Sequence, residues 1–262
     1  MRGFLIDLDG TLYTDRGAVP GAVETIAELR RRGIPFLFVT NTTRRSRRRL
    51  VERLLGYGFE VSAEEIVTAV VAGARFLKEK GYRKIAPFVS PDTLEDLSQF
   101  ELVGPLAGSD GAGDGAPDAV VMGDLGGGWT PGLLNQAFRY VLDGAALVAL
   151  QKDRYWLGPS GLELDAGPYV AAIEYATNKR AAVCGKPEAE FYRAALGLLG
   201  VRGRDVAMVG DDLWGDVQGA QRAGLAGWLV RTGKFREDVL RESGVVPDRI
   251  LDSVADLLEE TG

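Results

Sequence analysis

Short apolar runs alternate with amphipathic helical patterns along most of the chain, and this alternation constrains the fold more than any other feature. Residues 4–8 and 34–39 are apolar enough for buried strands. Each is followed by a polar loop and by apolar residues at helical spacing, over 22–32 and 44–55. Strands joined through helices run parallel, because such a crossover returns the chain to the same end of the sheet. The pattern predicts a doubly wound, mostly parallel, Rossmann-like α/β fold.

A second run of the same alternation begins near residue 68 and ends near residue 177. It contains its own apolar strands and helical patterns, so it has the parts of an independent α/β unit. A chain of 262 residues is long enough for two domains of this size. We therefore expect a core domain formed by residues 1–70 and 179–262, and an inserted α/β domain formed by residues 71–178.

The chain contains no histidine and one cysteine, Cys184. This composition excludes the Ser-His-Asp and Cys-His nucleophile systems and the usual zinc sites. Any chemistry must use carboxylates, lysine, arginine, hydroxyls or a hard metal ion. A single cysteine forms no internal disulfide, which is typical of a reducing compartment. Because we find neither a signal peptide nor an apolar run of roughly 20 residues, we expect a cytoplasmic protein with no membrane partner.

The first strand ends in two acids, Asp7 and Asp9, which are two residues apart. Side chains alternate between the faces of a strand, so these two point the same way. They lie at the carboxyl end of the strand, where open α/β sheets bind their ligands. Gly10 and Thr11 then turn the chain away. Two carboxylates so close repel each other, and a bound cation or a shared proton is the usual remedy.

Three more predicted strands end in polar residues, and in one parallel sheet all four ends would lie on the same edge. The second strand ends at Thr40 and Asn41, where hydroxyls and a helix N-terminus suit either a phosphate or an ordinary helix cap. Residues 181–185 lead into Lys186, and residues 206–209 lead into a second acidic cluster. That cluster consists of Asp211, Asp212 and Asp216.

Magnesium suits this set of residues, because it prefers hard oxygen ligands and keeps water while it binds a substrate phosphate. Calcium fits less well, since no loop has the spacing of an EF-hand. Phosphoryl transfer needs a nucleophile, a cation, further positive groups and a proton donor. The predicted strand ends supply each of these parts without histidine.

The same residues resemble the four ordered motifs of the haloacid dehalogenase-like hydrolase superfamily. The matching segments are residues 7–12, Thr40-Asn41, Gly185-Lys186-Pro187, and Gly210-Asp211-Asp212 with Asp216. The inserted block resembles the large α/β cap of subfamily IIA. Further segments are similar to the phospholysine phosphohistidine inorganic pyrophosphate phosphatase group, namely residues 39–43, 171–177, 210–212 and 230–235.

This resemblance implies roles for the residues that would handle the substrate. Asp7 would be the nucleophile that forms an aspartyl-phosphate. Asp9 would be the general acid that protonates the leaving group and then activates water. Thr40 and the backbone at Asn41 would hold the phosphoryl oxygens, and Lys186 would balance the charge of the nucleophile and the phosphate.

The resemblance also implies a metal site. Mg²⁺ would be held by Asp211, together with Asp7 and the backbone carbonyl of Asp9. Asp216 would orient a metal-bound water rather than contact the ion itself. Asp212 either supports the metal ligands without contacting the ion or caps a helix.

The resemblance implies a Mg²⁺-dependent phosphatase, a phosphoric monoester hydrolase, that acts on small phosphorylated metabolites. It does not identify the substrate or the oligomeric state, and it admits a homodimer through the cap. The cap would close over the crevice and select the leaving group. Residues 123–125 and 157–164 are candidate contacts, although their composition is equally typical of plain loops. The net charge of −6 argues against a nucleic-acid partner.

Two alternative functions stay open. Receiver domains of signalling proteins also combine an acceptor aspartate, an acidic pair, a threonine and a lysine. The chain length, the inserted block and the presence of Asp9 beside Asp7 argue against such a phospho-acceptor switch. The other alternative is a cap-bearing protein that binds a phosphorylated ligand without turning it over.

Overall fold

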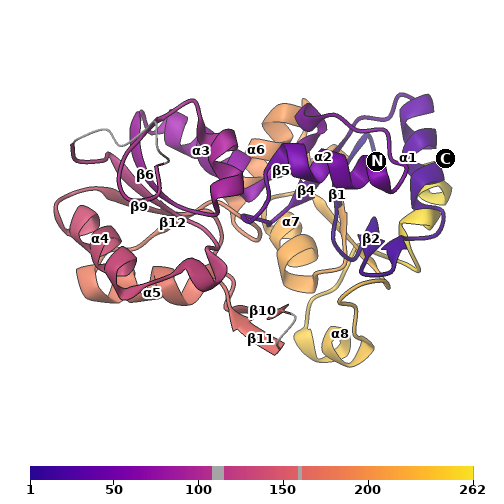
Figure 1. Cartoon of the computed structure of the whole chain (residues 1–262). Coiled ribbons are helices and arrows are strands. Elements are labelled where there is room, and N and C mark those ends of the chain that lie inside the picture. The colour runs from indigo at the N-terminus through magenta and orange to yellow at the C-terminus, as the bar shows by residue number, and fades with distance from the viewer. Residues whose placement is uncertain (108–114, 159–160, 262) are drawn as a thin grey trace. The chain divides into compact units, whose positions relative to one another are not determined.

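The computed structural model describes residues 1–107, 115–158 and 161–261, which form two compact units (Figure 1). The first unit consists of Met1–Thr40, Arg48–Val67 and Lys186–Gly262. The second unit consists of Asn41–Arg47 and Thr68–Gly185. The chain therefore enters the second unit for a short segment directly after Thr40, which the sequence pattern did not predict.

The first unit is built on a six-stranded sheet in the order β15-β14-β13-β1-β4-β5. The central strand β1 pairs in parallel with both β13 and β4, and β14 and β15 continue the parallel pairing. These pairings confirm the predicted parallel α/β fold. The strands are β1 Gly3–Asp7, β4 Phe36–Thr40, β5 Ile66–Thr68, β13 Val206–Gly210, β14 Ala226–Val230 and β15 Arg249–Leu251, with a small hairpin of β2 Tyr13–Thr14 and β3 Gly17–Ala18.

Both faces of this sheet are covered. In β14, Trp228 and Val230 join one hydrophobic cluster, whereas Leu229 between them joins another. Since neighbouring side chains of a strand point to opposite faces, the two clusters lie on opposite faces of the sheet. The sheet is therefore doubly wound, as predicted. Its helices are α1 Ala22–Arg31, α2 Arg47–Gly56, α6 Ala189–Leu199, α7 Gly219–Arg222 and α8 Glu237–Ser243.

The segment after β13 begins as a π-helical turn over Leu213–Gln218 and continues into α7. The carbonyl of Asp212 accepts hydrogen bonds from both Asp216 and Val217, at 2.9 and 3.2 Å, so the turn is wider than an α-helix. This wide turn fixes the position of the acidic cluster relative to the strand end.

The second unit contains a five-stranded sheet in the order β12-β9-β8-β6-β7, in which all neighbours pair in parallel. Its strands are β6 Lys84–Phe88, β7 Glu101–Leu102, β8 Ala119–Met122, β9 Ala146–Ala149 and β12 Ala182–Val183, and its helices are α3 Ala69–Glu79, α4 Pro131–Leu142 and α5 Ala166–Thr177. A separate antiparallel hairpin is formed by β10 Tyr155–Gly158 and β11 Gly161–Leu164. Within the described residues, we find no helix with the length and apolar character needed to span a bilayer.

Strand β12 corrects one step of the sequence analysis. The strand expected over residues 181–185 was placed in the same sheet as β1, β4 and β13. Instead β12 pairs with β9 of the second unit. A two-residue apolar strand carries too little pattern to show which of two similar sheets it joins. Only three of the four expected strand ends therefore belong to one sheet.

Side chains of β1 pack in the core of the first unit, so substitutions there should lower its free energy of unfolding. Phe4 is fully buried, and its ring packs edge-on against Trp228 at a centroid distance of 5.7 Å. We expect Phe4→Ala to lower the free energy of unfolding by about 3–5 kcal/mol, because the cavity cannot refill. Urea denaturation measures this loss.

The matched control is Leu55→Ala, since Leu55 is 54% exposed on the same unit. We expect its free energy of unfolding to change by about 0.5 kcal/mol or less. Equal losses for the two variants would contradict the assignment of β1 to the centre of the sheet.

Candidate active site

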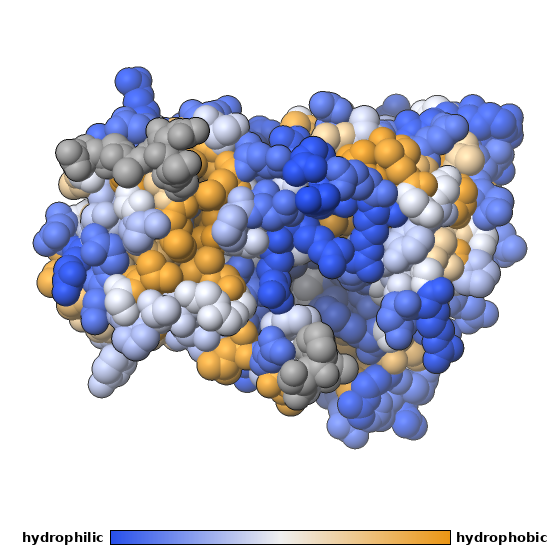
Figure 2. Space-filling model, in the orientation of Figure 1, coloured by the Kyte–Doolittle hydropathy of each residue, from blue (hydrophilic) through white to orange (hydrophobic). Residues whose placement is uncertain are grey.

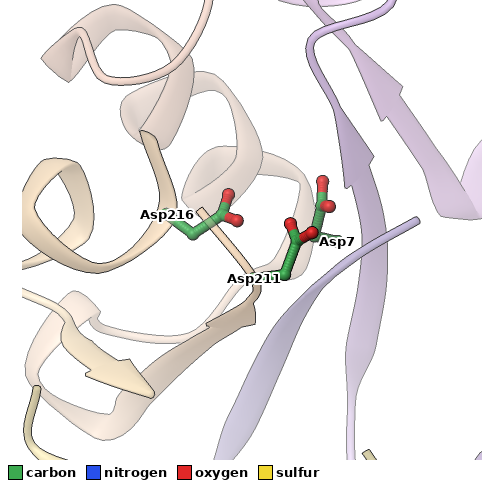
Figure 3. Close-up of side chains that lie close together, drawn as sticks. All are labelled: Asp7, Asp211 and Asp216. Carbon is green, nitrogen blue, oxygen red and sulfur yellow. The ribbon is translucent and has the colours of Figure 1, made fainter. Parts of the chain in front are cut away.

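Three buried carboxylates converge at the carboxyl ends of the neighbouring strands β1 and β13. They belong to Asp7, Asp211 and Asp216, and one oxygen from each lies within 4.8 Å of the other two. Figure 3 shows the Asp7 and Asp211 carboxylates beside each other, with that of Asp216 directed toward them. Parallel pairing of β1 with β13 brings two of these acids together, and the π-helical turn supplies the third.

The ammonium group of Lys186 lies between two of these carboxylates. Its Nζ atom donates to Oδ1 of Asp7 and to Oδ1 of Asp216, both at 2.6 Å. Lys186 is the first residue of the first unit after β12. It therefore reaches the site from the chain's return out of the second unit, not from a strand end of the β1 sheet as expected.

The charges of this cluster are strongly coupled. Burial raises the pKa of Asp7 well above its usual range; Lys186 opposes this effect, and the carboxylates of Asp216 and Asp211 add to it. Burial and the charge of Asp216 raise the pKa of Asp211 to about 7. Burial would lower the pKa of Lys186, but Asp216 and Asp7 hold it well above its usual range. Lys186 thus contacts two of the three carboxylates, and the charge of Lys234 also opposes the raised pKa of Asp211.

Asp211 is held by a loop that the sequence analysis did not assign to the site. The backbone N–H of Lys234 donates to Oδ2 of Asp211 at 2.7 Å. Gly233 and Gly10 both have positive φ, and a Cβ on either would lie 2.0 Å from the same oxygen. The other carboxylate oxygen, Oδ1, is buried and has no hydrogen-bond partner among the residues that the structure describes. The glycine-lysine step of residues 233–234 was the available signal, but it lies far from Asp211 in sequence.

Asp212 and Asp216 have separate tasks. Oδ1 of Asp212 accepts the backbone N–H groups of Trp214 and Gly215, so Asp212 caps the π-helical turn. Its Oδ2 lies 3.0 Å from Nζ of Lys234. Both oxygens of Asp216 are already engaged, since Oδ1 accepts from Lys186 and Oδ2 accepts the backbone N–H of Asp212 at 3.0 Å.

The residues fit a hard divalent cation. An unpartnered buried carboxylate oxygen costs free energy, and metal coordination is one of the few ways to satisfy it. Oδ1 of Asp211 is such an atom, and it lies with the Asp7 carboxylate in a cluster with excess negative charge. Oxygen-only ligands and excess negative charge suit Mg²⁺.

The other predicted residues lie outside this buried cluster. The Asp9 side chain is 60% exposed, and its Oδ1 atom is 3.9 Å from Nη1 of Arg53. Thr40 is buried at the end of β4, one residue beyond the partner of Asp7 in the sheet register. Asn41 begins the segment that groups with the second unit, where its Nδ2 atom donates to Asp153 at 3.4 Å.

The N-terminus of α2 is not available in the way the sequence suggested. The backbone N–H groups of Ser46 and Arg47 donate to the carboxylates of Asp92 and Asp96, at 3.0 and 2.9 Å. These carboxylates take the place at the helix N-terminus that a phosphate would otherwise occupy. Arg48 and Arg49 of α2 are about half exposed and pair with Glu52. The surface over α2 is strongly hydrophilic (Figure 2).

Of the two loops expected to contact substrate, the first has a structural task. The side chain of Asp124 is buried. The backbone N–H of Asp124 donates to Oγ1 of Thr43 at 2.9 Å, and the Asp124 carboxylate forms an ion pair with Arg44 at 3.4 Å. It therefore anchors the 41–47 segment within the second unit. In the second loop, residues 157–164, positions 159–160 lie outside the described residues.

The fold and the cluster define a Rossmann-like α/β protein with a buried acidic centre at its strand ends, whose residues fit a divalent cation. The chain belongs to the haloacid dehalogenase-like hydrolase family. A family model of that description matches residues 4–102, and a second one, described as HAD-hydrolase-like, matches residues 183–257. These matches confirm the predicted family.

Named relatives cover nearly the whole chain. Human haloacid dehalogenase-like hydrolase domain-containing protein 2 is 42% identical over 90% of this chain and 86% of its own length. Human phospholysine phosphohistidine inorganic pyrophosphate phosphatase is 37% identical, over 99% of this chain and 93% of its own. The solved p-nitrophenyl phosphatase from Archaeoglobus fulgidus superposes with a TM-score of 0.87 at 30% identity, over 99% and 98% of the two chains.

The unpartnered oxygen of Asp211 predicts metal-dependent stability. We expect Mg²⁺ to raise the melting temperature of the wild-type protein, because a ligand that binds only the folded state stabilises it. Asp211→Asn should lose most of this rise, while its metal-free melting temperature stays the same or increases, because the neutral amide relieves the repulsion among the acids. Thermal unfolding with and without Mg²⁺ measures both effects.

Asp238→Asn is the matched control, since Asp238 is 51% exposed and pairs with Arg236 on the same unit. It should keep the full rise with Mg²⁺. A rise that survives Asp211→Asn would contradict the assignment of this carboxylate to a metal.

The raised pKa of Asp165 predicts that the stability of the second unit depends on pH. Burial raises the pKa of Asp165 from 3.8 to about 6, although the backbone N–H of Ala166 and the amide of Gln151 oppose this. Between about pH 4 and pH 6 the folded protein binds a proton that the unfolded chain has lost. The free energy of unfolding should therefore decrease as the pH rises through this window.

We expect Asp165→Asn to remove this contribution, of order 2 kcal/mol, so that urea-unfolding curves at the two ends of the window differ less than in the wild type. Identical pH dependence in the two proteins would show that the folded-state pKa is not raised.

Proposed function

We propose that this protein is a Mg²⁺-dependent phosphatase that hydrolyses small phosphorylated metabolites through an aspartyl-phosphate on Asp7. The observation that carries the proposal is the buried pairing of Lys186 with Asp7 and Asp216 beside Asp211, whose Oδ1 atom has no partner. Membership of a hydrolase family supports it, as do relatives whose names describe phosphatases.

Asp7, Asp211 and the backbone carbonyl of Asp9 would hold the Mg²⁺ ion, which, when bound, would supply positive charge to the phosphoryl oxygens. Asp216 would support the site without contacting the ion, since its two oxygens already accept hydrogen bonds from Lys186 and from the backbone of Asp212. Lys186 favours the ionised form of Asp7, which burial opposes. A bound cation would act in the same direction as Lys186, so that Asp7 would attack as a carboxylate.

In the first step, a carboxylate oxygen of Asp7 would attack phosphorus as the bond from phosphorus to the ester oxygen breaks. Asp9 would give its proton to the departing oxygen, releasing the alcohol. In the second step, Asp9 would take a proton from the water that attacks phosphorus, and Asp7 would be regenerated. Thr40 and the backbone at Asn41 would hold the phosphoryl oxygens. The net reaction consumes one water and yields an alcohol and phosphate.

The second unit would serve as the cap that selects the leaving group, and a homodimer through this unit stays a prediction. Hairpin β10–β11 presents exposed apolar side chains, Tyr155, Leu162 and Leu164. The cytoplasmic location and the absence of nucleic-acid and membrane partners also stay predictions. The receiver-like switch and the inactive binding protein gain no support from the family or from the named relatives.

Replacement of the nucleophile tests the proposal. We expect the wild-type protein to release phosphate continuously from p-nitrophenyl phosphate when Mg²⁺ is present. Asp7→Asn should reduce the rate by at least about 10³-fold, because the amide cannot attack phosphorus. A panel of pyrophosphate and of sugar, nucleotide and pyridoxal phosphates would then identify the preferred leaving group.

Stoichiometry separates the alternatives. One phosphate per chain without a steady state would support the phospho-acceptor switch, and metal-dependent binding without any release would support the inactive binding protein. A folded Asp7→Asn variant that retained the wild-type rate would overturn the assignment of the nucleophile.

A further inference from the structure

We propose that Arg53 is a positioning residue for the general acid, and that it holds the Asp9 carboxylate where the leaving oxygen must receive its proton. This role rests on the proposed function. Nη1 of Arg53 lies 3.9 Å from Oδ1 of Asp9. In the part of the chain that the structure describes, Arg53 is the cation that forms an ion pair with this carboxylate.

Arg53 is itself held by two aromatic rings. Its guanidinium carbon lies 4.3 Å from the centre of the Tyr13 ring and 5.8 Å from that of Tyr57. Tyr13 is almost completely buried, and the centres of the Tyr13 and Tyr57 rings are 5.3 Å apart. A guanidinium group stacked on a buried aromatic ring loses less freedom when it also pairs with an anion. The platform therefore fixes the direction from which Arg53 approaches Asp9.

The same tyrosine is joined to the backbone of Asp9. The loop after β1 turns at Gly10, whose N–H donates to the carbonyl of Tyr13 at 2.7 Å, and Asp9 forms a β-bridge with Tyr13. The backbone of the acid and the ring that supports Arg53 thus form one rigid turn. The Asp9 side chain extends from this turn and is 60% exposed.

Asp9 needs this support more than the other carboxylates do. Asp7 and Asp216 are fixed by Lys186, and Asp211 by the backbone of Lys234. In the proposed reaction, Asp9 must meet the leaving oxygen and afterwards the attacking water, as a carboxylate between the two proton transfers. A misplacement of about 1 Å in such a group can cost about 10²-fold in rate. Arg53 supplies the missing constraint.

The leaving group distinguishes positioning of the acid from a general structural role. p-Nitrophenolate departs without a proton, whereas an alkoxide requires one. We expect Arg53→Met to lower kcat/KM for glycerol 2-phosphate by about 10- to 100-fold. The value of kcat/KM for p-nitrophenyl phosphate should change by less than about twofold. Rapid-quench measurements with p-nitrophenyl phosphate should show more phosphoenzyme at steady state, because Asp9 also activates the water.

Two further variants complete the experiment. Arg53→Lys keeps the positive charge and should recover part of the lost kcat/KM for the alkyl phosphate. Arg49→Met is the matched control, since Arg49 lies on the same helix, is 55% exposed and pairs with Glu52. It should leave the ratio of the two kcat/KM values at the wild-type value. Circular dichroism and thermal unfolding confirm that each variant is folded.

Equal losses of kcat/KM for the alkyl and the aryl phosphate, or no loss for either, would overturn this role for Arg53 while the proposed function stands. Wild-type protein that releases phosphate from neither substrate would overturn the proposed function, and the role of Arg53 with it.

Discussion

The pairing of the Lys186 ammonium group with Asp7 and Asp216 is the interaction on which the rest of the site depends. Both nitrogen-to-oxygen distances are 2.6 Å, and all three side chains are buried. Removing one partner of a buried ion pair typically costs about 3–5 kcal/mol, because it leaves a charge in a poorly solvating environment. Lys186 therefore offsets part of the cost of placing the Asp7 carboxylate inside the protein.

Lys186 by itself does not balance the negative charge of the three carboxylates, and this excess negative charge suits a bound cation. Asp211 adds a third carboxylate, and burial together with the neighbouring carboxylates raises the pKa values of Asp7 and Asp211. A divalent cation would bring compensating positive charge to this cluster. Repulsion among the three carboxylates lowers the stability of the fold as long as this charge is not compensated.

Glycine residues allow the backbone to pass close to these carboxylates, so that several acids fit in one small region. A Cβ on Gly210 would lie 2.1 Å from Oδ2 of Asp216, and one on Gly10 or Gly233 would lie 2.0 Å from Oδ2 of Asp211. Glycine at each position allows a carboxylate to pack directly on the chain. Gly210 thus makes room for Asp216, and Gly10 and Gly233 make room for Asp211.

From the sequence by itself, the parallel α/β architecture, the two strand ends that carry Asp7 and Asp211, and the exclusion of histidine chemistry were predictable, because periodicity and composition report on local geometry. Tertiary structure decided the rest. Lys186 and Asp7 are 179 positions apart, β12 joined the other sheet, and the 41–47 segment grouped with the second unit. Likewise, the pairing of Arg53 with Asp9 and of Lys234 with Asp211 has no local pattern. Such contacts arise only when segments far apart in the chain pack together, so only the folded structure could show which charges meet.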